Sequence, residues 1–237
     1  AEQLEHIQSP KLIDKLDKIS YDDIKRIKFD RQLPSPILYP YGYKGDALFQ
    51  VDENQHPQLA PLIKTLKSWD HVASADSKGA LIYNLAYYMV PKLMNGRAYD
   101  ALTKEEAVTV YQQIYDYLMK NFHTIDLTLG DMQKLVRGDQ SWPQAGMPDV
   151  LAAVNSVPWK DGLRRMEGGD AYISFVRFPK DGSLPLIESV NTFGASSNPS
   201  SPHFADQRPL YQAQQLKKMT LDKGEVLKKA ERVYHPE

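Results

Sequence analysis

Apolar residues recur at intervals of three and four positions through much of the first half of the chain, which is the spacing of one face of an α-helix. The pattern is clearest after Thr103, where Ala107, Ile114 and Leu118 fall on one side. Residues 33–43 instead contain three prolines and three tyrosines, so we expect a connector there. The spacing predicts helices over residues 10–19, 20–28, 59–69, 78–93 and 103–118.

Three of these predicted helices have a recognisable first residue. Thr103 and Glu106 form a T-x-x-E capping box, in which each side chain bonds the backbone N–H of the other residue. Ser20 and Asp23 have the same spacing at the second helix. Pro10 stands where the first helix is expected to begin, because a missing N–H costs nothing at that position.

The pattern changes after Gly130. Glycine and proline recur from residue 131 onward and predict loops and turns. Residues 171–178 and 184–193 then predict two strands, joined through a turn at Asp181-Gly182. Both strands carry apolar residues on both faces, so we expect a sheet that is covered from two sides. A last helix is predicted over residues 222–234, with an apolar stripe at Val226, Leu227, Ala230 and Val233.

Together these elements predict an α+β fold. Residues 1–130 are expected to be a helical region, and residues 131–237 a loop-rich segment with β-strands and a C-terminal helix. The two regions are expected to pack as one unit. A chain of 237 residues with 42% hydrophobic residues is large enough to bury a substantial core.

Charge and composition narrow the classes of function. The 29 basic and 30 acidic residues nearly cancel and are mixed along the chain, which argues against a nucleic-acid-binding surface. No apolar run is long enough for a membrane span, and the charged first residues do not resemble a secretory leader. The absence of cysteine excludes disulfides and thiolate metal sites.

The stretch SSNPSSPHFADQ, residues 196–207, brings Ser201, His203 and Asp206 close together in the sequence. A catalytic triad requires the imidazole to lie between the hydroxyl and the carboxylate, and six consecutive residues rarely reach that geometry. Two prolines also stiffen the segment. We therefore expect a rigid loop in which Ser, Asn and Asp side chains bond neighbouring backbone groups.

Other candidate chemistry is sparse. The six histidines show neither H-x-H nor H-E-x-x-H spacing, so no metal site within one element is predicted. Gly168-Gly169 precedes a predicted strand rather than a helix, which is not the order of a phosphate-binding loop.

The same loop carries a resemblance to the penicillin acylase family. Members commonly show a G-x-S-x-x-P pattern followed by S-P-H-(Tyr/Phe)-x-D-Q, and this sequence has both from Gly194 to Gln207. Further patches are similar in the same order, from about Ile19 to Pro236. They are ISYDDIKRIKFD, LKSWDHVASADSKGAL, LGDMQKLVRGDQSWPQAGMPDVLAAVN, GGDAYISFVRF and LYQAQQLKKMTLDKGEVLKKAERVY. The resemblance is to the branch with acyl-homoserine-lactone and lipopeptide acylases.

The resemblance implies an N-terminal nucleophile hydrolase with a four-layer αββα core. In such enzymes a serine at the start of the β subunit attacks the amide and its own α-amine acts as base. The matched patches resemble the C-terminal part of that β subunit, and residue 1 here is Ala. We therefore expect no catalytic residue in this chain and no acylase activity by the chain alone. Motif residues expected to have a structural role are Gly194, Ser196, Pro199, Ser201, Pro202, His203, Asp206 and Gln207.

The resemblance also implies partners and surroundings. The partners are the α subunit and the N-terminal part of the β subunit, and the complete enzyme takes a small N-acyl substrate of β-lactam, acyl-homoserine-lactone or lipopeptide type. No cofactor is expected in this chain, although family members may bind calcium elsewhere, and the family is generally periplasmic or secreted. Two alternatives remain at this point: a non-catalytic interaction or scaffold module, and a hydrolase that uses Ser201, His203 and Asp206 directly.

Overall fold

A computed structural model describes residues 12–33, 38–39, 43–97, 100–230 and 232–233. The chain divides into two compact units, Ala1–Gly169 and Asp170–Glu237. Helices predominate as far as Met132 and strands follow from Gln133, so the structure confirms the α+β class with a helical first half. The grouping of residues 1–130 and 131–237 within one packed unit stays a prediction.

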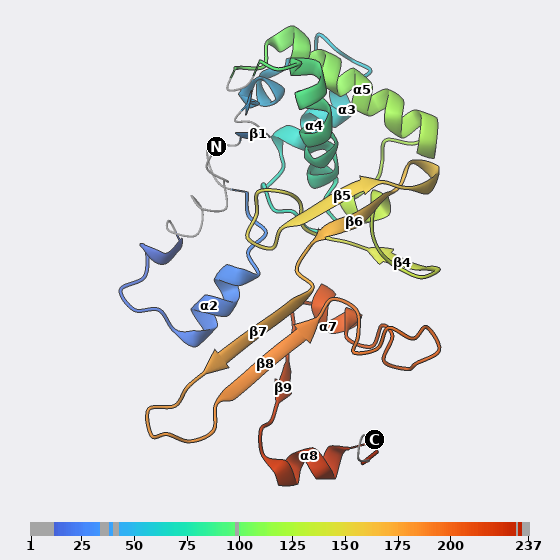
Figure 1. The fold of residues 1–237 in the computed structure, drawn as a ribbon. Helices are drawn as coiled ribbons and strands as arrows, with labels where there is room; N and C mark the ends of the chain where they lie inside the picture. Colours follow the sequence, from blue (N-terminus) through green and yellow to red (C-terminus); the bar gives the residue numbers. More distant parts are fainter. Residues whose placement is uncertain (1–11, 34–37, 40–42, 98–99, 231, 234–237) are drawn as a thin grey trace. The chain divides into compact units, whose positions relative to one another are not determined.

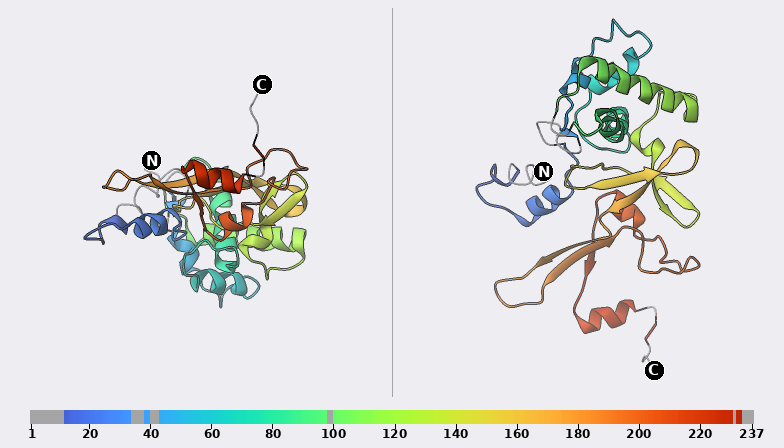
Figure 2. Two further views of the ribbon diagram at one scale, coloured as in Figure 1. Left: turned by 90° about the horizontal axis from the view of Figure 1, so that it is seen from below. Right: turned by 45° about the horizontal axis from the view of Figure 1, so that its top comes forward.

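Helix α4 (Lys78–Met94) is the buried helix of the first unit, and α3 (Ala60–Lys67), α5 (Lys104–Phe122) and α6 (Leu129–Met132) contact it. The unit also contains α2 (Tyr21–Lys28) and 3-10 turns at Asp46–Gln50 and Lys160–Gly162. Helix α4 is apolar nearly all round, which is the pattern of a buried helix. One view in Figure 2 looks almost along α4, which lies between α5 and the four-stranded sheet described below.

Local capping explains where three of the helices begin. Ser20 and Asp23 form a complete capping box at α2, and Thr103 and Glu106 form another at α5, as predicted. The side chain of Ser77 accepts a hydrogen bond from the backbone N–H of Ala80 at the start of α4. The predicted helices over 20–28, 59–69, 78–93 and 103–118 are confirmed by α2, α3, α4 and α5.

A four-stranded sheet completes the first unit. Its strands are β3 (Gln133–Arg137), β4 (Gln140–Pro143), β5 (Val154–Pro158) and β6 (Arg164–Gly169), in the order β4-β3-β6-β5. Strands β3 and β6 pair in parallel and the other pairs are antiparallel. This sheet occupies a stretch predicted to be loops and turns. The prediction was wrong because pairing between distant strands outweighed the local glycines and prolines. Short strands β1 (Leu38–Tyr39) and β2 (Tyr43–Lys44) lie in the predicted connector.

The second unit has a three-stranded antiparallel sheet. Strands β7 (Tyr172–Arg177) and β8 (Leu186–Asn191) form the predicted hairpin, and β9 (Lys217–Met219) pairs with β8. The connection is longer than the predicted tight Asp-Gly reversal, because residues 178–185 lie between the two strands. The N–H of Gly182 donates to the carbonyl of Pro179 at 3.3 Å, so the turn centres on Lys180 and Asp181, and Gly182 follows it with a φ of 75°. The unit also contains the short helices α7 (Arg208–Gln212) and α8 (Lys223–Lys229).

Two predictions about local structure need correction. The helix predicted over 10–19 falls partly outside the described residues, and of the described part only residues 12–13 are helical, with turns at 14–15 and bends at 17–18. Helix α8 ends at Lys229, and its apolar stripe is about half exposed at Val226 and Leu227. Short helices without a packed apolar face are marginal, which explains both differences. Within the second unit, Tyr172 and Val176 are exposed on one face of the sheet, and the expected cover on both sides stays a prediction.

Candidate functional site

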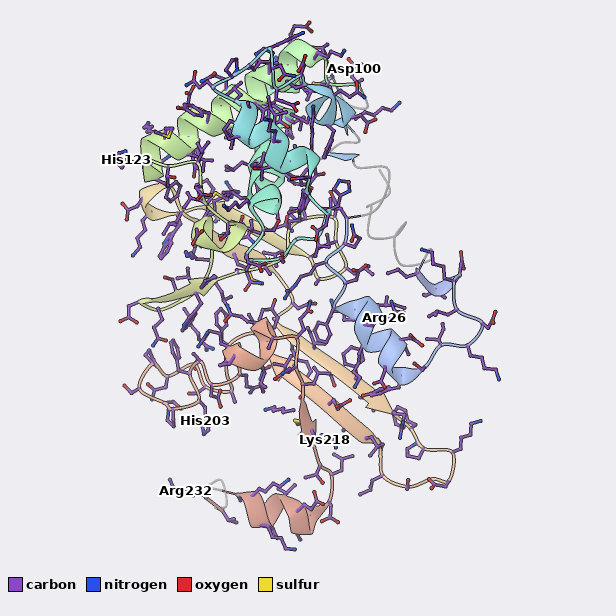
Figure 3. The ribbon with its side chains drawn as sticks, turned by 180° about the vertical axis from the view of Figure 1, so that it is seen from behind. Arg26, Asp100, His123, His203, Lys218 and Arg232 are labelled. Atoms are coloured by element: carbon purple, nitrogen blue, oxygen red, sulfur yellow. The ribbon has the colours of Figure 1, made fainter. Side chains whose placement is uncertain are left out.

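The motif found in the sequence forms an ordered loop between β8 and α7 in the second unit. We call residues 194–207 the motif loop. Figure 3 shows the loop with His203 labelled upon it. Its first half is held by side chains that accept bonds from backbone N–H groups two residues ahead. Ser196 Oγ accepts from Asn198 N at 3.1 Å, and Asn198 Oδ1 accepts from Ser200 N at 3.0 Å. Such turns replace the ladder bonds that an irregular segment lacks.

The second half brings the three candidate triad residues together. His203 Nδ1 lies 2.8 Å from Asp206 Oδ2, and the two side chains are 41% and 37% exposed. Ser201 Oγ accepts a hydrogen bond of 3.1 Å from the backbone N–H of His203. A catalytic serine donates its hydroxyl to the imidazole. The bond at Ser201 is the same kind of side-chain-to-backbone turn found at Ser196, and such turns are typical of a structural loop.

Both ends of the motif loop are fastened by backbone contacts. The N–H of Ser196 donates to the carbonyl of His203 at 3.1 Å, and the N–H of Gln207 donates to the carbonyl of Phe193 at 2.8 Å. The buried Gln207 side chain accepts from Asn191 N at 3.0 Å, which ties the loop to the end of β8. A Cβ on Gly194 would overlap with the His203 carbonyl and the Asp206 carboxylate, so only glycine fits there.

The motif residues therefore fall into two groups. Pro199 and Pro202 lie in exposed turns of the loop, where their fixed φ limits its freedom. The other six are joined by the hydrogen bonds and the close approach just described. They are Gly194, Ser196, Ser201, His203, Asp206 and Gln207. Their structural role in the complete protein stays a prediction.

A second polar cluster, in the first unit, had not been predicted. Arg164 on β6 is only 8% exposed, and its guanidinium lies 3.7 Å from the centre of the Tyr88 ring on α4. Its Nε donates to Ser156 Oγ at 3.0 Å, and Nη2 also donates to the Ser156 carbonyl. The Tyr88 hydroxyl accepts from Ser156 N at 3.1 Å. Nothing in the sequence pattern could have identified these three distant residues as neighbours.

The residue whose pKa is shifted most clearly, Tyr87, belongs to neither polar cluster. Burial raises the pKa of Tyr87, and the carboxylate of Asp149 raises it further, so this phenol stays protonated. Within the described ranges, no group of three His, Cys, Asp or Glu residues could hold a metal ion. None of the helices in these described ranges is both long enough and apolar enough to cross a membrane.

Comparison with known proteins connects the motif loop with a family. The sequence profile of the family described as Penicillin amidase matches residues 7–228, which is nearly the whole chain. The chain belongs to the penicillin amidase family. This confirms the family resemblance carried by the motif loop.

The curated relatives of this chain include proteins named acyl-homoserine lactone acylase PvdQ. One from Pseudomonas fluorescens is 38% identical over 85 residues, which are 35% of this chain and 11% of the relative. One from Pseudomonas syringae pv. tomato is 24% identical over 223 residues, 82% of this chain and 28% of the relative. One from Pseudomonas savastanoi pv. phaseolicola is 29% identical over 193 residues, 71% of this chain and 24% of the relative. The matches span no more than 28% of these relatives.

Proposed function

We propose that this chain is the C-terminal part of the β subunit of an amidohydrolase, and we call that longer protein the parent acylase. The observation that carries the proposal is the family match over residues 7–228. The motif loop supports it, because six of its eight motif residues are joined by specific bonds and a close approach. The parent acylase hydrolyses the amide bond of an N-acyl compound and releases a carboxylic acid and an amine.

Among the three substrate types that the family suggests, we propose the acyl-homoserine-lactone type. The support is that the relatives reported above bear that name. In the proposed reaction a serine of the parent acylase, outside this chain, attacks the acyl carbonyl, the amine departs, and water then releases the acid. The transition state carries negative charge on the carbonyl oxygen, which preorganised N–H donors stabilise.

This chain serves that reaction as a structural component, by the same proposal. Ser201 Oγ is engaged with a backbone N–H, and the His203–Asp206 pair lies within one loop. The motif loop holds the end of β8 against the start of α7. The remainder of the parent acylase is the partner, and a periplasmic or secreted location follows for the assembled enzyme. Cell fractionation with an antibody against this chain tests the location.

The test of the activity compares the parent acylase with the 237-residue chain on an N-acyl-homoserine lactone. We expect the parent acylase to release free homoserine lactone and the chain alone to release none. Ser201→Ala in the parent acylase should leave kcat essentially unchanged, because by this proposal Ser201 has a structural role in the motif loop. Turnover by the chain alone that Ser201→Ala abolishes would establish a Ser-His-Asp hydrolase instead. A parent that hydrolyses none of the three N-acyl substrate types would favour the scaffold alternative.

A further inference from the structure

Asn84 is a fully buried polar side chain on α4, the buried helix of the first unit. Its exposed fraction is 0%, and neither its Oδ1 nor its Nδ2 has a hydrogen-bond partner among the described residues. Nearly all buried polar groups of native proteins are paired, because an unpaired one keeps the full cost of its lost hydration. The amide of Asn84 therefore requires a hydrogen-bonding group that the described residues do not supply.

The contacts of α4 show which layer of the first unit Asn84 faces. Seven residues earlier, the carbonyl of Ser77 accepts a bond of 3.0 Å from the N–H of Leu129, the first residue of α6. Four residues later, the hydroxyl of Tyr88 accepts from the N–H of Ser156 on β5 at 3.1 Å. Residues four and seven positions apart share one side of an α-helix. Asn84 therefore lies on the side of α4 that faces α6 and the four-stranded sheet.

Gln133, the first residue of β3, brings a second unpaired atom into the same layer. It pairs with Arg164 on the parallel strand β6, and paired residues of neighbouring strands point to the same face of a sheet. Arg164 reaches the Tyr88 ring, so this is the face toward α4. Gln133 is 0% exposed, and its Nε2 donates to the carbonyls of Gln144 and Gly146 at 3.1 and 2.8 Å. Its Oε1 has no partner within the described part of the chain.

The chemistry of these atoms identifies the missing group. Asn84 Nδ2 is a donor and needs an acceptor, whereas Asn84 Oδ1 and Gln133 Oε1 are acceptors and need a donor. A metal cation cannot accept a hydrogen bond, and a halide ion cannot donate one. Water does both, and a buried water typically makes about three bonds to otherwise unpaired groups.

We infer that a buried water is bound between α4 and the four-stranded sheet, where it joins the amide of Asn84 to Oε1 of Gln133. A bridging water is enthalpically almost as favourable as a direct hydrogen bond. It thus fastens the buried helix to the start of β3 and satisfies polar groups on both elements. The site lies in the first unit alone, so it does not depend on the proposed function.

A crystal structure of the 237-residue chain, at a resolution that shows ordered solvent, tests the inference directly. We expect a solvent peak within about 2.7–3.2 Å of the Asn84 amide and of Gln133 Oε1. The absence of such a peak would overturn the inference. A direct bond from the Asn84 amide to another protein group would overturn it as well.

Thermal unfolding of Asn84→Leu gives a second measurement, because leucine has the same branching without the polar atoms. Loss of the water leaves Gln133 Oε1 unpaired, so the melting temperature should fall by about 2–10 °C. If no water is bound, leucine replaces an unpaired amide and the melting temperature should rise, which would contradict the inference. Gln113→Leu is the control, since Gln113 is an exposed carboxamide on α5, and it should leave the melting temperature unchanged. A fall for Asn84→Leu without a solvent peak in the wild-type crystal would indicate overpacking and also overturn the inference.

Discussion

At the scale of single residues, the motif loop depends most on Gly194. A methyl group there would overlap with the His203 carbonyl and the Asp206 carboxylate, and the backbone cannot easily move away. Asp206 itself makes a partly exposed pair with His203, and such pairs contribute only about 0–1 kcal/mol. The loop is therefore more sensitive to steric change at Gly194 than to loss of charge at Asp206.

We expect Gly194→Ala to lower the melting temperature clearly, and Asp206→Ala to lower it by a smaller amount. Gly224→Ala is the matched control, because Gly224 lies in helix α8, where alanine is favoured. Differential scanning calorimetry on the three variants measures the difference. An unchanged melting temperature for Gly194→Ala would show that the loop is not packed as described.

At the scale of elements, the capping box of α5 links a local sequence pattern to stability. Thr103 Oγ1 accepts from Glu106 N at 3.2 Å, and Glu106 Oε2 accepts from Thr103 N at 2.9 Å. Glu106 also pairs with Arg97. The bond from the Thr103 backbone is the main cause that lowers the pKa of Glu106 below its usual value, and Arg97 lowers it further.

We expect Thr103→Ala to cost about 1 kcal/mol in the free energy of unfolding, the usual cost of a lost N-cap. Thr109→Ala is the control, because Thr109 is exposed in the same helix. The contribution of Glu106 depends on pH. Since its pKa is lower in the folded state, the carboxylate stabilises the fold above its unfolded pKa of about 4.3, and this is lost as pH falls through the folded value.

The difference in stability between wild type and Glu106→Gln should therefore be present at pH 7 and shrink as the solution becomes more acidic than about pH 4. Urea unfolding at several pH values measures it. A difference that stays constant with pH would show that the charge of Glu106 does not contribute.

At the scale of the whole molecule, the buried core is unevenly shared. The main hydrophobic cluster runs from Leu33 to Val150 and lies in the first unit. The second unit buries only a few large apolar side chains and exposes many, among them Phe178, Leu184 and Leu221. Since burial of apolar surface drives folding, the first unit holds most of the stabilising energy within this chain.

We expect a fragment of residues 1–169 to unfold cooperatively and residues 170–237 alone to show no cooperative transition. Circular dichroism on heating measures both, and binding of a hydrophobic dye should be stronger for the second fragment. Cooperative unfolding of residues 170–237 alone would contradict this distribution of core.

The sequence could predict those features that depend on nearby residues. The sequence predicts helices α4 and α5, the capping boxes of α2 and α5, and the strands β7 and β8, because each depends on spacing or caps within a few positions. The motif loop was also identified, because its bonds join residues that are close in sequence. The apolar residues on both faces of the hairpin were visible too, although not which face would be left open.

The sequence by itself thus determined the helices, the hairpin and the motif that led to the penicillin amidase family. Only the tertiary structure decided the strand order β4-β3-β6-β5 and the packing of the Arg164 guanidinium on the Tyr88 ring. It also decided that Val176 and Met219 are exposed. The physical reason is how many residues separate the contacting groups in the sequence. Caps and turns are fixed by groups a few residues apart, whereas strand pairing, burial of a charge and the choice of a covered face depend on distant residues.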